Sequence, residues 1–299
     1  MHDRPTLRTS AFKQVDVFTA EPMRGNALAV VLDAEGMSTA AMQQVAAWTN
    51  LSETTFVLPP TQAGADYRVR IFTPQSELPF AGHPSVGTAH ALLESERLQR
   101  KDTLVQECGD GLLPLRVVGR GVDRRVFVRT PRARFGQLPP EAGDAVAQAL
   151  RAGPGMPPPR RVTLGPAWIV CDLGSAAAVR ALTPDMAALV ALRQRFDAVY
   201  FTVFGRADSG DHALVVRAFC PADGIPEDPV TGSANAAIGE YLHATGGLSA
   251  IGANYRVSQG KEVGRDGTVE VHVDTATGQV EIGGQSITCV DGTVALPLD

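Results

Sequence analysis

The stretch ELPFAGHPSVGTAHALL, residues 77–93, decides the fold of this chain. The proline after His83 has the backbone angle of a first helical turn and lacks only an N–H group that would be unpaired there, so we expect a helix to begin at Pro84. Gly82 and His83 would then lie at the helix N-terminus. Free N–H groups and a partial positive charge make such a terminus a site for a carboxylate or a phosphate.

The chain repeats this pattern once. The sequence FTP at 72–74 matches FCP at 219–221, which lies 147 residues later. Further on, GTA at 87–89 matches GSA at 232–234, which lies 145 residues later. A single repeat of this length predicts two similar α+β domains from one duplicated unit, whereas a solenoid would repeat every few tens of residues. We expect the equivalent helix N-termini to face each other across a cleft, where ligand sites tend to lie.

Glycines and a serine mark the place where an anionic group would bind. Gly82 and Gly232 allow close approach to backbone N–H groups, and Ser233 adds a hydroxyl, so we expect a carboxylate there. Glycine in a first helical turn costs up to about 1 kcal/mol relative to alanine. The presence of glycine at both Gly87 and Gly232, which we take as matched positions, therefore needs an explanation. Close helix packing is the alternative to ligand binding.

Three titratable residues are candidates for proton transfer. Asp228 precedes a proline, and this position favours the role of a helix N-cap over that of a functional carboxylate. His83, at the place we take as equivalent, is a poorer cap, and a helix N-terminus lowers the pKa of a histidine so that it can relay protons. Glu53 begins a predicted strand, and its counterpart 145 residues later is Ala198. A carboxylate that occurs in only one of the two repeats is either functional or an ordinary surface glutamate.

The composition excludes several classes of protein. Of the 299 residues, 44% are hydrophobic and 20% are charged, and the net charge is −5 with both signs scattered. No basic run points to nucleic acid or to a membrane surface. No apolar run could span a bilayer and the N-terminus lacks the apolar core of a signal peptide, so we expect a cytoplasmic protein. The cysteines and histidines lack metal-ligand spacing and no nucleotide-binding motif occurs, so we expect no metal and no cofactor.

A change in composition suggests the domain boundary. Prolines and glycines crowd residues 131–160 around a short alanine-rich helix at 141–151, as is typical of a linker or a boundary. We therefore divide the chain into two epimerase-like halves, 1–130 and 131–299. The last strand, near 288–299, is a candidate to return to the N-terminal half.

Several sequence blocks together resemble the PhzF family of phenazine biosynthesis, from about residue 12 to 295. The blocks are VDVFT (15–19), GNALAVV (25–31), NLSETTF (50–56), FAGHPSVGTA (80–89) and EDPVTGSA (227–234), with QG at 259–260. The resemblance implies a diaminopimelate-epimerase-like fold, in which each of two halves has a curled mixed sheet around a central helix. It also implies a homodimer.

The resemblance further implies chemistry. The family's characterised member is a cofactor-free isomerase of trans-2,3-dihydro-3-hydroxyanthranilate. A carboxylate that takes a proton from carbon needs a pKa raised toward neutrality, which burial would supply. By the resemblance, Glu53 is the proton carrier, and His83 and Asp228 assist it. Gly82, Gly232 and Ser233 are the residues that hold the substrate carboxylate.

Two departures from the family pattern leave the substrate open: Ala27 replaces a proline, and RDG at 265–267 replaces Arg-Pro-Ser. One rival function is an epimerase or racemase of an amino-acid-like substrate. Relatives with that activity use a cysteine at each helix N-terminus, and neither 81–83 nor 228–230 contains one, so only a mechanism without cysteine stays open. The other rival is a non-catalytic protein that binds a small carboxylate. The retained Glu53 argues against it.

Overall fold

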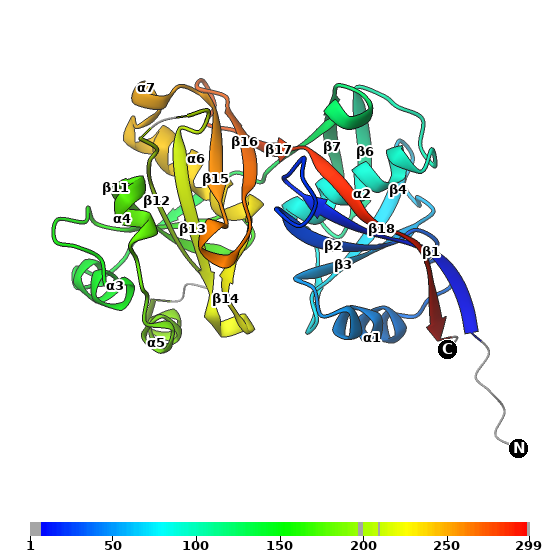
Figure 1. Ribbon diagram of the computed structural model, residues 1–299, viewed down its shortest axis with the longest axis horizontal. Helices are drawn as coiled ribbons and strands as arrows, with labels where there is room; N and C mark the ends of the chain where they lie inside the picture. Colours follow the sequence, from blue (N-terminus) through cyan, green and yellow to red (C-terminus); the bar gives the residue numbers. More distant parts are fainter. Residues whose placement is uncertain (1–6, 197–199, 209, 298–299) are drawn as a thin grey trace, which may run out of the picture. The chain divides into compact units, whose positions relative to one another are not determined.

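The computed structural model describes residues 7–196, 200–208 and 210–297. Contacts divide the chain into two compact units, the first comprising Met1–Val128 with Gly283–Asp299 and the second Arg129–Ile282. Each unit has its own strands and helices (Figure 1).

The first unit has a mixed sheet in the order β18–β1–β2–β3–β4–β6–β7–β8, with the short β5 beside β4. The pairs β2/β3 and β4/β6 are parallel and the other pairs are antiparallel. Its elements are β1 (Leu7–Val17), β2 (Asn26–Val31), α1 (Thr39–Thr49), β3 (Glu53–Leu58), β4 (Tyr67–Phe72), β5 (Glu77–Leu78), α2 (Gly82–Glu94), β6 (Thr103–Cys108), β7 (Gly111–Val118), β8 (Arg125–Arg129) and β18 (Ser286–Pro297).

Helix α2 is the core of this unit. Its residues from His83 to Leu93 are all buried, and it packs against β1, β2, β3 and β18. Gly87 lies in the helix interior, where an added Cβ would come within 2.7 Å of side-chain atoms of both Val17 and Leu28. Helix packing therefore explains Gly87, the alternative that the sequence left open.

The second unit has a sheet in the order β9–β10–β11–β12–β13–β15–β16, with β14 beside β13. The pairs β11/β12 and β13/β15 are parallel. Helix α6 is largely buried and packs against β10, β11 and β16. The elements are β9 (Arg134–Gly136), α3 (Ala142–Leu150), β10 (Arg160–Thr163), β11 (Ala167–Ser175), α4 (Ala176–Arg180), α5 (Met186–Phe196), β12 (Tyr200–Arg206), β13 (Leu214–Cys220), β14 (Ile225–Asp228), α6 (Gly232–Thr245), α7 (Leu248–Ile251), β15 (Asn254–Gln259), β16 (Gly267–Val273) and β17 (Val280–Gly284).

The two units have the same order of parallel and antiparallel pairs around a buried helix, as the repeat predicts. The strand register corrects one detail of the repeat. Thr54 pairs with Phe72 in the first unit and Phe201 pairs with Phe219 in the second, so the counterpart of Glu53 is Tyr200. The expected counterpart, Ala198, lies outside the described residues. A carboxylate is present on one side only in either alignment.

The helix starts also differ from expectation. Helix α2 begins at Gly82 with Ala81 as N-cap, so Pro84 lies inside the first turn. Helix α6 begins at Gly232 with Thr231 as N-cap. None of the first four N–H groups of a helix has a partner within the helix, so proline is tolerated beyond the first position and does not fix the start.

Asp228 is therefore not a helix cap. It is the last residue of β14, where its Cα pairs with Ala218, and the equivalent pair in the first unit is Leu78 with Ile71. The match of Asp228 with His83 was wrong because the second unit has an insertion before β14, so Gly232 corresponds to Gly82. The match of GTA at 87–89 with GSA at 232–234 was wrong for the same reason.

The proline-rich segment 131–160 is part of the second unit. Its helix α3 buries Val146 and Leu150 in a hydrophobic core that also contains Leu189 of α5. At the other end of the chain, β18 pairs with β1 along its whole length, which places this strand in the first unit. The second unit accordingly ends at Ile282, before the C-terminus of the chain.

Candidate functional site

Glu53 and His83 form a close pair in the first unit. Glu53 is the first residue of β3, and His83 is the second residue of α2, which packs on that strand. The Oε2 atom of Glu53 lies 3.4 Å from Nε2 of His83, and the two side chains are 16% and 7% exposed. Glu53 is therefore not an ordinary surface glutamate.

Burial determines the charge of His83. Its imidazole is enclosed by the packing of α2, and this desolvation lowers the pKa of His83 to about 3. A neutral imidazole has one N–H donor and one acceptor nitrogen. With the proton on Nε2, His83 can donate toward the Glu53 carboxylate, so the pair combines a proton acceptor with a neutral donor.

The start of α2 adds backbone donors beside this pair. Within the described chain, no side chain caps the helix at Ala81, and the N–H of Ser85 bonds to the Ala81 carbonyl at 3.2 Å. Pro84 has no N–H group. The N–H groups of Gly82 and His83 therefore point out of the helix start, and Gly82 is partly exposed.

The second unit places Asp228 in a buried hydrogen-bond network. The Thr231 hydroxyl donates to Oδ2 of Asp228 at 2.5 Å, and the amide of Gln259 on β15 contacts both residues. Gly232 and Ser233 follow as the first two residues of α6, and Ser233 is partly exposed. The side chain of its N-cap residue, Thr231, makes no capping hydrogen bond to α6.

The structure thus groups the predicted residues by unit: Gly82, Glu53 and His83 in the first, and Asp228, Gly232 and Ser233 in the second. The contact of Thr231 with Asp228 and the role of Gln259 were not predicted from the sequence. The QG pair at 259–260 was noticed only as part of the resemblance. A buried glutamine at the end of a strand becomes informative once the strand's neighbours are known.

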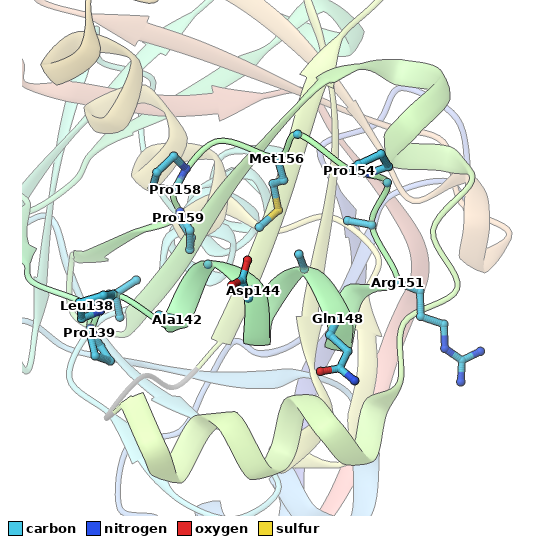
Figure 2. A pocket seen from close by; sticks show the side chains of 16 residues that line it. Leu138, Pro139, Ala142, Asp144, Gln148, Arg151, Pro154, Met156, Pro158 and Pro159 are labelled. Atoms are coloured by element: carbon cyan, nitrogen blue, oxygen red, sulfur yellow. The ribbon is translucent and has the colours of Figure 1, made fainter.

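A pocket of about 860 Å³ lies elsewhere in the second unit, between α3 and the loop that follows it. Figure 2 shows Met156 extending toward α3, while the guanidinium of Arg151 points away from the pocket. None of the predicted site residues lines it. The pocket is therefore separate from the residues considered for catalysis.

Two further findings concern the described residues alone. They contain no group of three or more histidine, cysteine or acidic side chains that could hold a metal ion. They also contain no helix that is long and apolar enough to cross a membrane. Cys108, Cys171 and Cys220 are buried free thiols, and burial raises the pKa of Cys171 to about 12.

Comparison with known proteins identifies the class. A family model described as phenazine biosynthesis-like protein matches residues 15–292. The chain is 35% identical over 289 residues to trans-2,3-dihydro-3-hydroxyanthranilate isomerase of Pseudomonas aeruginosa, covering 94% of this chain and 98% of that protein. It is 37% identical over 295 residues to antisense-enhancing sequence 1 of Schizosaccharomyces pombe, covering 94% and 97%.

A crystal structure of a PhzF-family phenazine biosynthesis protein from Bacillus anthracis matches with a TM-score of 0.81 at 26% identity, covering 96% of this chain and 99% of that one. The fold and the relatives define an isomerase with the expected epimerase-like architecture. The chain belongs to the PhzF family, as the sequence blocks predict.

Proposed function

We propose that this protein is a cofactor-independent isomerase that moves a proton between two carbons of a small carboxylate resembling trans-2,3-dihydro-3-hydroxyanthranilate. The observation that carries the proposal is the Glu53–His83 pair, in which Oε2 lies 3.4 Å from Nε2 and both side chains are largely buried. The name of the P. aeruginosa relative supports this substrate class.

In this mechanism Glu53 takes the proton from one ring carbon and returns it to another. Nε2 of the neutral His83 lies 3.4 Å from Oε2 of Glu53 and is in position to orient the carboxylate. A positioned acid or base of this kind contributes roughly 10²- to 10⁴-fold in rate. Because the same group accepts and returns the proton, the reaction has no net change in protonation and needs no redox partner.

Backbone donors at the helix starts hold the substrate carboxylate in this proposal. The N–H groups of Gly82 in the first unit and of Gly232 and Ser233 in the second are suited to an anion, because helix N-termini carry a partial positive charge. Asp228 assists as a second acidic group. Its hydrogen bond from Thr231 supports a defined orientation for this carboxylate.

We further propose that the protein is a homodimer, as the family resemblance implies, and that it acts in the cytoplasm. Light scattering coupled to size-exclusion chromatography tests the dimer. A single monomeric mass at micromolar concentration would contradict it.

Two other functions compete with the isomerase. An epimerase without catalytic cysteine would exchange the α-proton of an amino-acid-like substrate. A non-catalytic carboxylate-binding protein would bind and exchange nothing, but such a protein has no need of a buried glutamate beside a neutral histidine.

The test is turnover of trans-2,3-dihydro-3-hydroxyanthranilate by the purified wild-type protein, followed by NMR and absorbance. A shift of the ring double bonds supports the isomerase. Inversion of an amino acid from a parallel panel of chiral substrates, with the cyclic compound unchanged, would favour the epimerase. Saturable binding of the cyclic compound without any reaction would favour the binding protein.

A further inference from the structure

Gln259 is a buried residue whose side chain bonds to the Asp228 turn and to the first turn of α6. It is the last residue of β15 and is 1% exposed. Its Oε1 accepts from the N–H of Thr231 at 3.1 Å and from Nδ2 of Asn235 at 2.9 Å. Its Nε2 donates to the carbonyl of Asp228 at 3.1 Å and to Oγ1 of Thr231 at 2.9 Å.

Backbone groups fix the orientation of this amide. The N–H of Thr231 can only donate, so the atom facing it must be the oxygen Oε1. The carbonyl of Asp228 can only accept, so the atom facing it must be the nitrogen Nε2. A flipped amide would face a donor with a donor and an acceptor with an acceptor.

The orientation of the amide then fixes the direction of the next hydrogen bond. The Thr231 hydroxyl accepts from Nε2 of Gln259, so its single proton is left for Oδ2 of Asp228, 2.5 Å away. The chain of donors runs in one direction, from Gln259 through Thr231 to Asp228. An oxygen that receives a hydrogen bond from a hydroxyl is favoured in the ionised form of the carboxyl group.

The first unit has a glutamine at the matching strand with a different target. Gln106, on β6, donates from Nε2 to the Ser85 hydroxyl at 2.9 Å and accepts from the Tyr67 hydroxyl at 3.0 Å. The Ser85 hydroxyl in turn bonds to the carbonyl of Ala81. There the relay ends on backbone, whereas in the second unit it ends on a carboxylate.

The nearest charged neighbours of Asp228 on its own hairpin compensate each other. Glu227 precedes Asp228 in β14 and is paired through two hydrogen bonds with Arg217 of β13. Because successive side chains of a strand point to opposite faces, this pair lies across β14 from the Asp228 carboxylate. The Thr231 hydroxyl is the donor that the structure places on Oδ2 of Asp228.

We infer that Gln259 is a positioning residue: it directs the Thr231 hydroxyl proton at Asp228 and so holds Asp228 ionised and in one orientation. The role of Asp228 in turnover rests on the proposed function, but the relay itself does not. In the reaction, Asp228 assists in its ionised form, while Glu53 alone accepts and returns the proton.

The test is the titration of Asp228 in the full-length protein labelled with ¹³C at aspartate carboxyl groups. Its resonance is assigned by its loss in Asp228→Asn. Thr231→Val removes the donating hydroxyl, and Gln259→Glu keeps the shape but offers Thr231 an acceptor. We expect both to raise the pKa of Asp228 by about one unit or more, as loss of a hydrogen bond to a carboxylate does. Thr231→Ser, which retains the hydroxyl, should restore the wild-type value.

Gln106→Leu is the matched control, because it removes a buried glutamine whose relay does not reach Asp228. It should lower stability and leave the Asp228 titration unchanged. An unchanged titration in both Thr231→Val and Gln259→Glu, with both variants folded, would overturn the inference. So would an equal shift in Gln106→Leu.

A second measurement separates this inference from the proposed function. If wild type isomerises the cyclic substrate, the acidic limb of its kcat profile should move to higher pH in Thr231→Val and Gln259→Glu, by the shift seen in the titration, with little change in KM. If wild type turns over nothing while the titration shifts as expected, the proposed function fails and the relay stands. If wild type is active and the profile does not move although the titration does, Asp228 has no role in turnover and the positioning role is refuted.

Discussion

Arg217 and Arg70 form the same ion pair in environments that differ in burial, and the difference predicts unequal effects on stability. Arg217 on β13 makes two hydrogen bonds to Glu227, of 2.9 and 2.7 Å, and Arg70 on β4 makes two to Glu77, of 2.7 and 2.6 Å. Each guanidinium also lies 5.1 Å from the ring centroid of a phenylalanine two residues on. The repeat thus provides a matched pair.

Burial separates the two pairs. The side chains of Arg217 and Glu227 are both 7% exposed, whereas those of Arg70 and Glu77 are 19% and 38% exposed. Arg217→Met would leave the Glu227 carboxylate buried and unpaired, a change that costs about 3–5 kcal/mol. Arg217 also donates to the carbonyls of Val179 and Leu182, which would lose that donor. Arg70→Met should cost about 0–1 kcal/mol, as for partly exposed pairs.

The two tryptophans allow each unit to be followed separately in urea unfolding, since Trp48 lies in the first unit and Trp168 is buried in the second. Fluorescence of a Trp48→Phe background reports the second unit, and a Trp168→Phe background reports the first. The double variant Arg217→Met/Glu227→Leu should recover most of the lost stability, because no buried charge is then left unpaired. Equal losses for Arg217→Met and Arg70→Met would refute the argument from burial.

Other predictions follow from packing and charge. Gly87→Ala should destabilise by about 1–3 kcal/mol, since its Cβ would lie 2.7 Å from atoms of Val17 and Leu28. Gly143→Ala, whose Cβ would meet only Pro159 at 3.7 Å, should stabilise α3 by up to about 1 kcal/mol. Urea midpoints that move in the same direction for both would contradict this. Because burial lowers the pKa of His83 to about 3, the unfolded chain binds a proton below about pH 6.5 that the folded chain takes up only near pH 3. As the pH is lowered through this window, this residue should therefore reduce the free energy of unfolding by up to about 1.4 kcal/mol per pH unit. His83→Gln should flatten the dependence of stability on pH between pH 5 and 7. Parallel slopes for wild type and variant would show that the histidine is not buried in its neutral form.

Local signals in the sequence predicted local structure well. Serine is a residue type that caps helices, and the hydroxyl of Ser38 accepts from the N–H of Ala41 at the start of α1. The repeat of the FTP and FCP segments predicted two units of one topology, because those residues end equivalent strands.

Features that depend on tertiary pairing were harder to predict. Proline in a first turn does not mark the helix start, so the helix expected to begin at Pro84 begins at Gly82. Asp228, expected to cap a helix, is the last residue of a strand. The burial of Glu53 arises from the packing of α2 on β3 and has no signal in its own segment. Gln259 contacts Asp228 because β15 pairs in parallel with β13. The two matched stretches of the sequence do not predict this pairing.

The central claim is that Glu53 carries the proton. The direct test is conversion of trans-2,3-dihydro-3-hydroxyanthranilate in D₂O by wild type and by Glu53→Gln, with deuterium located in recovered substrate and product by NMR and mass spectrometry. Loss of this acid–base group should lower kcat by roughly 10²- to 10⁴-fold, abolish enzyme-dependent deuterium incorporation at ring carbon and leave the affinity for the compound within a few-fold of wild type. A Glu53→Gln protein that isomerises and exchanges as wild type does would contradict the account.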